Sequence, residues 1–209
     1  MTTKNLNVTC IGAGVIGSGW AARLLVNGIN VTVFDKQTES YNRTNASVER
    51  AKKCFSQLTK APLRAIGNLT FAKSLEDALK LPNYIIESLP ENLQIKQHLY
   101  KEIEEVSNNS IILSSTSGFK PTDLQKYMKN PENLVVTHPF NPVYLMPLVE
   151  VVPGQAKDQS IIDDVQHLLE YIGMVPIIIK KEIDAFVADR MLEAMWRDCL
   201  LYTSPSPRD

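Results

Sequence analysis

A glycine-rich turn near the start of the chain limits its possible folds most strongly. Residues 6–11 read as a short apolar strand, Gly12-Ala-Gly-Val-Ile-Gly17 follows, and apolar residues then recur at helical spacing. A second apolar segment, residues 30–34, ends on Asp35, which lies eighteen residues after Gly17. A strand, a glycine turn, a helix and a second strand that ends in an acidic residue are typical of a dinucleotide-binding βαβ unit.

Each glycine of this turn has a separate expected role. Gly12 makes the tight turn, Gly14 lets the backbone approach a pyrophosphate, and Gly17 lets the helix pack closely on the strand. The amides at the helix N-terminus and its positive dipole end would bind the phosphates. The alternative is a glycine turn without a ligand. The residues expected to bind the cofactor here are Gly12, Ala13, Gly14, Val15, Ile16 and Gly17.

Asp35 indicates which dinucleotide is bound. A carboxylate at this position would accept hydrogen bonds from the adenine-ribose hydroxyls and would repel a 2′-phosphate. NAD is therefore favoured over NADP, although the neighbouring Lys36 weakens this preference slightly. The alternative role of Asp35 is that of a capping residue.

The rest of the chain continues to alternate between strand and helix patterns. This alternation predicts an α/β fold with a doubly wound (Rossmann), mostly parallel sheet, followed by an amphipathic helix at 184–200. Further strands are expected at 69–71, 83–86, 110–113, 134–137, 148–152 and 175–179, and further helices at 37–60, 74–80, 92–106 and 158–171.

Polar residues follow the ends of several predicted strands. Besides the glycine turn and Asp35, they are Glu87, Ser114 and His138. Ligands of open α/β sheets bind outside the carboxyl ends of the strands, so a single crevice could collect all of these residues.

His138 and Glu150 form the candidate catalytic pair. They lie twelve residues apart in His138-Pro-Phe-Asn-Pro-Val-Tyr-Leu-Met-Pro-Leu-Val-Glu150, whose second half reads as a buried strand. Histidine is the side chain best suited to exchange a proton near neutral pH, and a buried carboxylate would orient it and stabilise its charged form. The alternative is a solvated histidine and a surface glutamate.

Ser114 and Asn141 are the other candidate catalytic residues. Ser114 begins Ser114-Ser-Thr-Ser117 at a strand end and could hydrogen-bond a substrate hydroxyl or the nicotinamide ribose; helix capping before Pro121 is the alternative for this segment. Asn141 could orient a carbonyl of the ligand or the nicotinamide amide, or could simply be a turn residue before Pro142.

Composition excludes several other classes of protein. The formal charge of −1 gives no basic face for nucleic acid, and no apolar segment is long enough to span a membrane. The three cysteines, Cys10, Cys54 and Cys199, have neither metal-ligand spacing nor an even count for disulfides, so we expect no metal site and a reducing compartment. The polar N-terminus is unlike a signal peptide, and together these features predict a cytoplasmic protein.

These residues resemble the 3-hydroxyacyl-CoA dehydrogenase superfamily over about residues 6–200. The glycine fingerprint, the stretch Ile85-Ile-Glu-Ser-Leu-Pro-Glu-Asn92, the Ser114–Ser117 segment and the His138-to-Glu150 block occur in the family's order. The resemblance implies that His138 is the general base for the 3-hydroxyl proton and that Glu150 pairs with it. It also implies that Ser114 and Asn141 lie near substrate and cofactor, and that Glu91 and Lys96 lie near the cofactor, NAD.

Within the superfamily, the sequence looks most like the branch that oxidises L-carnitine to 3-dehydrocarnitine. The stretches that indicate this include Ser114-Ser-Thr-Ser-Gly-Phe-Lys-Pro121 and Ala185-Phe-Val-Ala-Asp-Arg190, where Asp189 stands in place of the asparagine usual in acyl-CoA members. A quaternary ammonium group is bound by aromatic faces and nearby negative charge. The candidate substrate residues are Phe140, Tyr144, Phe186, Trp196 and the countercharge Asp189.

The resemblance also predicts the domain organisation. Residues 1–182 would form the NAD-binding domain and 183–200 the first helix of a truncated, all-helical domain, which in the family completes the active site and forms a homodimer. Residues 201–209 look like an unrelated or disordered tail, so we expect this chain to bind NAD but to have little activity alone. The alternatives are a 3-hydroxyacyl-CoA dehydrogenase acting on 3-hydroxybutyryl-CoA, a gulonate-type dehydrogenase, and a non-catalytic NAD-binding fragment.

Overall fold

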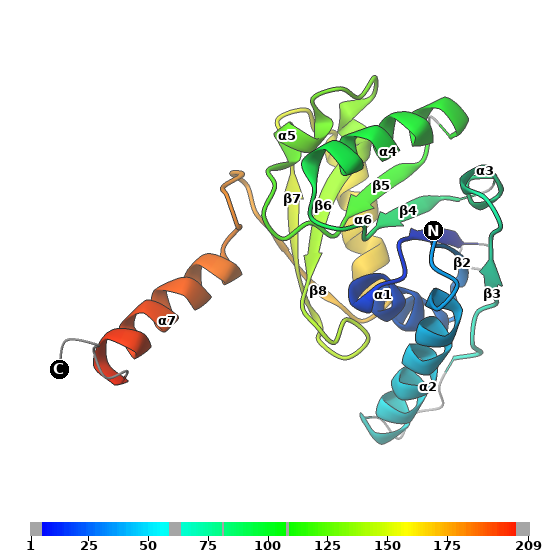
Figure 1. Ribbon diagram of the computed structural model, residues 1–209, viewed down its shortest axis with the longest axis horizontal. Coiled ribbons are helices and arrows are strands. Elements are labelled where there is room, and N and C mark those ends of the chain that lie inside the picture. Colours follow the sequence, from blue (N-terminus) through cyan, green and yellow to red (C-terminus); the bar gives the residue numbers. More distant parts are fainter. Residues whose placement is uncertain (1–5, 59–63, 81, 108, 204–209) are drawn as a thin grey trace.

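The computed structural model describes residues 6–58, 64–80, 82–107 and 109–203 of the chain. Eight strands lie within these residues: β1 (Asn7–Ile11), β2 (Asn30–Phe34), β3 (Leu69–Phe71), β4 (Tyr84–Glu87), β5 (Ile111–Ser114), β6 (Leu134–Pro139), β7 (Leu148–Pro153) and β8 (Val175–Ile178). They form one sheet in the order β3-β2-β1-β4-β5-β6-β7-β8, which reverses direction between β1 and β4 (Figure 1). This order confirms the predicted doubly wound fold.

Helices cover both faces of the sheet. They are α1 (Val15–Val26), α2 (Ser40–Leu58), α3 (Leu75–Ala78), α4 (Leu93–Val106), α5 (Pro121–Gln125), α6 (Gln159–Tyr171) and α7 (Ala188–Thr203), with a 3-10 turn at Pro131–Asn133. The short α5 and the 3-10 turn were not predicted, because proline and polar residues in these segments look like a loop. The first three residues of the predicted helix at 37–60 form a bend and a turn, and its last two lie outside the described residues.

Two apolar cores lie on opposite faces of the sheet. One packs α1, α2 and α6 against alternate strand residues such as Ile86 and Val151. The other packs α3, α4 and α5 against the intervening residues, including Ile85 and Val152. Because successive strand side chains point to opposite faces, an almost continuously apolar strand supplies both cores.

The direction of the last two strands explains how the candidate catalytic pair meets. The strands β1 to β6 run parallel, whereas β7 pairs antiparallel with β6, and β8 runs parallel to β7. In this antiparallel register His138 lies directly opposite Glu150. The chain between them is therefore a return loop at the carboxyl edge of the sheet, where the cofactor turn also lies.

Arg23 joins α1 to two distant segments of the chain. Its side chain is buried; Nε donates to the Ile172 carbonyl at 2.9 Å, and the guanidinium also donates to the carbonyls of Tyr144 and Gly173. Burial lowers the pKa of the Arg23 guanidinium to about 10, so it remains charged at neutral pH. Three carbonyl oxygens thus replace the water that this charge has lost.

The last helix extends away from the sheet and its cores (Figure 1). The side chains of Met191, Leu192, Met195, Trp196 and Leu200 on α7 are all exposed. The helix was predicted at 184–200 but spans Ala188–Thr203, because residues 184–187 form a turn; residues 204–209 of the predicted tail lie outside the described part of the chain. Among the described residues, no helix is both long and apolar enough to cross a membrane.

Candidate active site

A cleft of about 670 Å³ lies at the carboxyl edge of the first strands. The glycine turn, the end of β2 and the segment after β4 form its walls. Five of the predicted cofactor residues line it: Gly12, Gly14, Val15, Ile16 and Asp35. Ala13 does not line the cleft and is fully buried, and Gly17 lies at the contact between α1 and the turn.

The three glycines have different steric surroundings. Gly12 has a φ of +86°, which favours glycine, and a side chain at Gly17 would place its Cβ 1.8 Å from the Gly12 carbonyl oxygen. At Gly14, by contrast, a Cβ would meet nothing within 4 Å. Gly12 and Gly17 are therefore required by the turn itself, whereas Gly14 leaves open space at the N-terminus of α1.

The Asp35 carboxylate fixes the turn from the side of β2. One oxygen accepts the Ala13 amide hydrogen at 2.6 Å and the other accepts that of Gln37 at 2.7 Å. Lys36 and Arg43 line the same end of the cleft, and Arg43 donates to the Ala13 carbonyl at 3.0 Å. Sequence reasoning noted Lys36 but missed Arg43, because that residue comes from the first turns of α2 and reaches the cleft only in the fold.

His138 and Glu150 form a buried hydrogen-bonded pair. The His138 Nδ1 lies 2.8 Å from the Glu150 Oε2. With Glu150 ionised, Nδ1 carries the proton and donates it, which leaves Nε2 free to accept another. The second carboxylate oxygen, Oε1, accepts the backbone amide hydrogens of Val187 and Ala188 at 2.9 and 3.0 Å.

A second cavity, of about 270 Å³, lies beside His138 and adjoins the cofactor cleft. Its walls include His138 and Pro139 together with Ile16, Ser88 and Leu89, and the last three also line the large cleft. The imidazole therefore borders a cavity that adjoins the cofactor cleft.

The structure does not bring Ser114 into either cavity. Its side chain is fully buried, donates to the Glu87 Oε2 at 2.7 Å and accepts from the Tyr100 hydroxyl at 3.0 Å. Ser115 and Ser117 line the small cavity instead. The expectation for Ser114 is therefore corrected: its position in the last residue of β5 turns the hydroxyl into the interior, and the serines of the following loop reach the site.

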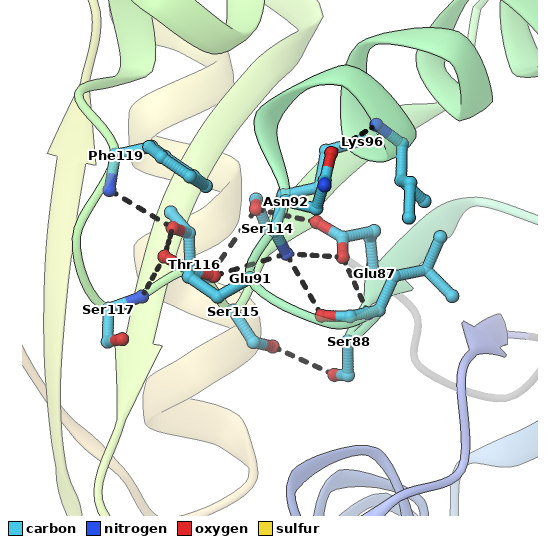
Figure 2. A network of polar contacts seen from close by, with 12 residues as sticks. Glu87, Ser88, Glu91, Asn92, Lys96, Ser114, Ser115, Thr116, Ser117 and Phe119 are labelled. Carbon is cyan, nitrogen blue, oxygen red and sulfur yellow. Dashed lines mark hydrogen bonds and ion pairs between the residues drawn. The ribbon is translucent and has the colours of Figure 1, made fainter.

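Glu91 and Lys96 belong to a polar network that also includes Glu87 and Ser114 (Figure 2). Glu91 lines that cavity and accepts hydrogen bonds from the Thr116 hydroxyl and from the amides of Ser117 and Gly118. Lys96 is buried rather than solvated, and its Nζ lies 2.7 Å from Glu87 and 3.6 Å from Glu91. Glu91 thus holds the loop that follows β5 in place. Lys96 balances the negative charge of Glu87 and Glu91.

Glu87 is the centre of this network, and its role there was not predicted. It is fully buried at the end of β4 and accepts hydrogen bonds from Lys96, Tyr100, Ser114 and the Leu89 amide. Burial, reinforced by the Glu87 carboxylate, holds the pKa of the Tyr100 phenol well above its usual range. A glutamate directly after an apolar strand was the available signal, because a buried carboxylate requires several donors.

The candidate substrate residues lie in different surroundings. The Phe140 and Phe186 rings lie 5.1 and 5.5 Å from the His138 ring, but Phe186 is fully buried and belongs to a core. Tyr144 is half-buried against the other core, and Asn141 is exposed in the return loop. Asp189 lies in the first turn of α7, and Trp196, farther along, is 63% exposed. Of these side chains, only Phe140 and Phe186 contact His138.

Comparison with known proteins identifies the family. The model of the family described as "3-hydroxyacyl-CoA dehydrogenase, NAD binding domain" matches residues 7–183. The chain belongs to this family. It is 47% identical over 192 residues to L-carnitine dehydrogenase of Mesorhizobium japonicum, covering 91% of this chain and 53% of that protein. It is 46% identical over 194 residues to L-carnitine dehydrogenase of Oceanobacillus iheyensis, covering 92% and 63%. The chain thus spans little more than half the length of these relatives.

Solved structures agree with this assignment. An NAD⁺-dependent dismutase, 5-formyl-3-hydroxy-2-methylpyridine 4-carboxylic acid 5-dehydrogenase, has a TM-score of 0.87 at 30% identity, covering 98% of this chain and 68% of that one. The (S)-3-hydroxybutyryl-CoA dehydrogenase of Ralstonia eutropha has a TM-score of 0.81 at 27% identity, covering 93% and 71%. The predicted family, fold and cofactor are confirmed.

The cleft fits NAD in two respects. The open space at Gly14 lies at the N-terminus of α1, where the amides and helix dipole bind a pyrophosphate, and α1 has no acidic residue in its first turn to repel one. Asp35 lines the cleft where ribose hydroxyls would be expected. Within the described residues, no group of three or more His, Cys, Asp or Glu side chains could hold a metal ion.

Gly14 and Gly17 provide a matched pair of substitutions. Gly17→Ala should lower the free energy of unfolding by about 3 kcal/mol, because its Cβ would overlap the Gly12 carbonyl. Gly14→Ala should change stability by less than about 1 kcal/mol but weaken NADH binding about tenfold, since its methyl group enters the space for the pyrophosphate. Urea unfolding and NADH fluorescence titration measure both effects. Full NADH affinity in Gly14→Ala would contradict this assignment of the cleft.

Tyr100→Phe should produce a pH-dependent loss of stability. At pH 8 the variant loses a donor to the buried Glu87 and should be destabilised by about 1–3 kcal/mol. Above pH 10 the phenol ionises in the unfolded chain but stays protonated in the native protein. Its contribution to the free energy of unfolding is therefore complete below pH 10 and declines as the pH rises further. The difference in free energy of unfolding between the native protein and Tyr100→Phe should therefore shrink by about 1.4 kcal/mol per pH unit above pH 10.

Urea unfolding at pH 8, 10 and 11 checks this prediction. Tyr127→Phe is the control, because Tyr127 is 51% exposed on the surface. A stability difference between Tyr100→Phe and the native protein that stays constant from pH 8 to pH 11 would show that the phenol does not titrate as described.

Proposed function

We propose that this chain is the cofactor-binding and base-bearing part of a dehydrogenase that oxidises the 3-hydroxyl group of L-carnitine. The observation that carries the proposal is the buried His138–Glu150 pair, whose histidine lines a cavity that shares three wall residues with the NAD cleft. The two L-carnitine dehydrogenases, at 47% and 46% identity, support the choice of substrate.

His138 would act as the general base. Its Nδ1–H is held by Glu150, so the lone pair of Nε2 can accept the proton of the substrate hydroxyl. Glu150 stabilises the resulting imidazolium and keeps the ring in the correct tautomer. NAD⁺, when bound, supplies the acceptor for the hydride that leaves the same carbon. A base of this kind contributes about 10²–10⁴-fold to the rate.

The small cavity would position the substrate hydroxyl. Ser117 and Ser115 contribute to its wall beside His138, and Glu91 holds the Thr116–Gly118 backbone in place. Asn141, in the exposed return loop, would orient the nicotinamide or the substrate. We assign Ser114 and Lys96 to support of this loop rather than to contact with ligands, because both are buried in the Glu87 network.

The trimethylammonium group would be bound by aromatic faces and by Asp189. Phe140 is half-buried next to His138, which makes it the strongest aromatic candidate. Tyr144 and Trp196 remain candidates, and Asp189 in the first turn of α7 would supply the countercharge. Phe186 is not available for this role because its ring is fully buried.

We further propose how the chain operates as part of a larger protein. Residues 183–200 would begin a helical domain that completes the site, and the exposed apolar side chains of α7 would be covered within it or in a homodimer. The spacing and odd number of the cysteines in the sequence support a reducing compartment such as the cytoplasm. Residues 1–209 alone should bind NADH but turn carnitine over slowly.

His138→Gln tests the assigned base. The most direct assay uses the chain continued beyond Leu200 with the remaining residues of the Mesorhizobium japonicum relative, and follows NADH formation with carnitine. The variant should lose about 10²–10⁴-fold in kcat and keep its NADH affinity. His167→Gln, on the exposed face of α6, is the matched control. Retained turnover in His138→Gln would show that another group is the base.

A substrate comparison tests the identity of the substrate. In the same continued protein, kcat/KM should be higher for L-carnitine than for 3-hydroxybutyryl-CoA, and Asp189→Asn should raise the KM for carnitine about tenfold by removing about 1.4 kcal/mol of attraction. A preference for 3-hydroxybutyryl-CoA would favour the acyl-CoA alternative, which the family's description supports. An unchanged KM in Asp189→Asn would remove the countercharge role.

A further inference from the structure

The linker, residues 182–188, follows β8 and ends with the first residue of α7; it is attached to the loop that lines the small cavity and to the start of α5. Glu182 accepts hydrogen bonds from the amide and the hydroxyl of Thr122 at 3.0 and 2.6 Å. Lys120 lies 3.1 Å from Asp184, and the Ala185 amide donates to the Gly118 carbonyl at 3.4 Å. The linker therefore follows the loop between β5 and α5 before the chain leaves the sheet.

The last residues of the linker contact both members of the catalytic pair. The Phe186 ring is fully buried and lies 5.5 Å from the His138 ring. The amides of Val187 and Ala188, at the start of α7, both donate to the Glu150 Oε1, while its Oε2 accepts from His138. A carboxylate is planar and rigid, so a rotation that releases one oxygen also moves the other. The orientation of Glu150 is thus set jointly by His138 and by the beginning of α7.

The backbone of the linker has an unusual conformation at this point. Ala185 and Phe186 have φ angles of +57° and +47°, in the left-handed region that residues other than glycine rarely adopt. Such a conformation persists only where surrounding contacts hold it. Here those contacts are the Gly118 carbonyl, the apolar core around Phe186 and the Glu150 carboxylate.

We propose that the linker is a positioning device for the general base: the Phe186 ring and the amides of Val187 and Ala188 hold Glu150 and His138 in their productive orientation. The pair is then correctly arranged only while the start of α7 stays hydrogen-bonded to Glu150. The consequence for catalysis rests on the proposed function, whereas the orientation of the pair does not. Phe186 is accordingly a positioning residue and not part of the substrate site.

Two substitutions at Ala185 separate the linker conformation from the chemistry of the pair. Valine is β-branched and disfavours a positive φ, whereas glycine adopts it readily. In the 209-residue chain, Ala185→Val should increase the hydrogen-exchange rates of the Val187 and Ala188 amides at least about tenfold and shift the ¹⁵N resonances of the His138 ring. Ala185→Gly should keep both the slow exchange and the ring resonances.

Two controls keep this experiment decisive. NADH affinity should be unchanged in both variants, because the linker residues are not among those that line the cofactor cleft. Unchanged affinity also shows that the sheet has folded. Phe186→Leu, which keeps an apolar side chain, is the second probe and should also shift the His138 resonances. The proposal is overturned if the His138 ring is unaffected while the Val187 and Ala188 amides exchange freely, or if Ala185→Val leaves both amides protected.

The catalytic consequence is measured separately in the protein continued with a helical domain. There Ala185→Val should lower kcat at least about tenfold relative to Ala185→Gly, with the KM for NAD⁺ unchanged. If none of the proteins oxidises carnitine, the proposed function fails, but the resonances of His138 still decide whether the linker positions the pair. Equal kcat values in the two Ala185 variants would refute a catalytic role for the linker.

Discussion

The antiparallel pairing of β6 with β7 is the constraint on which the site depends. It places Glu150 directly opposite His138, so the sheet itself brings the two side chains together. Residues opposite each other on paired strands have their Cβ atoms about 5 Å apart, a distance that an imidazole and a carboxylate span with one hydrogen bond. Continuing the parallel pattern of β1 to β6 would have required a crossover, and the pair could not have formed across adjacent strands.

The strands and the cofactor turn could be predicted from the sequence. The strands at 30–34 and 69–71 match the structure at both ends, because short apolar segments bounded by polar or glycine residues give a clear signal. The functional reading of Gly12, Gly14 and Gly17 followed from their position between a strand and a helix. These features depend on residues close together in the sequence, so the sequence alone is sufficient to predict them.

The parts of the site that could not be predicted depend on contacts between distant segments. The strand pattern placed Ser114 at the carboxyl edge of the sheet but could not show that its hydroxyl turns toward Glu87 and Tyr100. Nothing in the spacing of Lys96 distinguishes a buried ammonium group from a solvated one. Phe186 is an aromatic residue of the kind that binds a quaternary ammonium group, and only the structure shows that its ring is buried against His138.

The anchoring of α1 by Arg23 gives the cofactor turn a fixed base. The guanidinium lies near the carboxyl end of this helix, where a positive charge also opposes the helix dipole favourably, and it is joined to the main chain at residues 144, 172 and 173. A helix secured at its far end cannot slide or tilt freely, so the amides at its near end keep their direction before any phosphate arrives. The entropy lost in ordering these backbone amides is thus lost during folding and not on binding, so the dinucleotide meets amides that are already aligned.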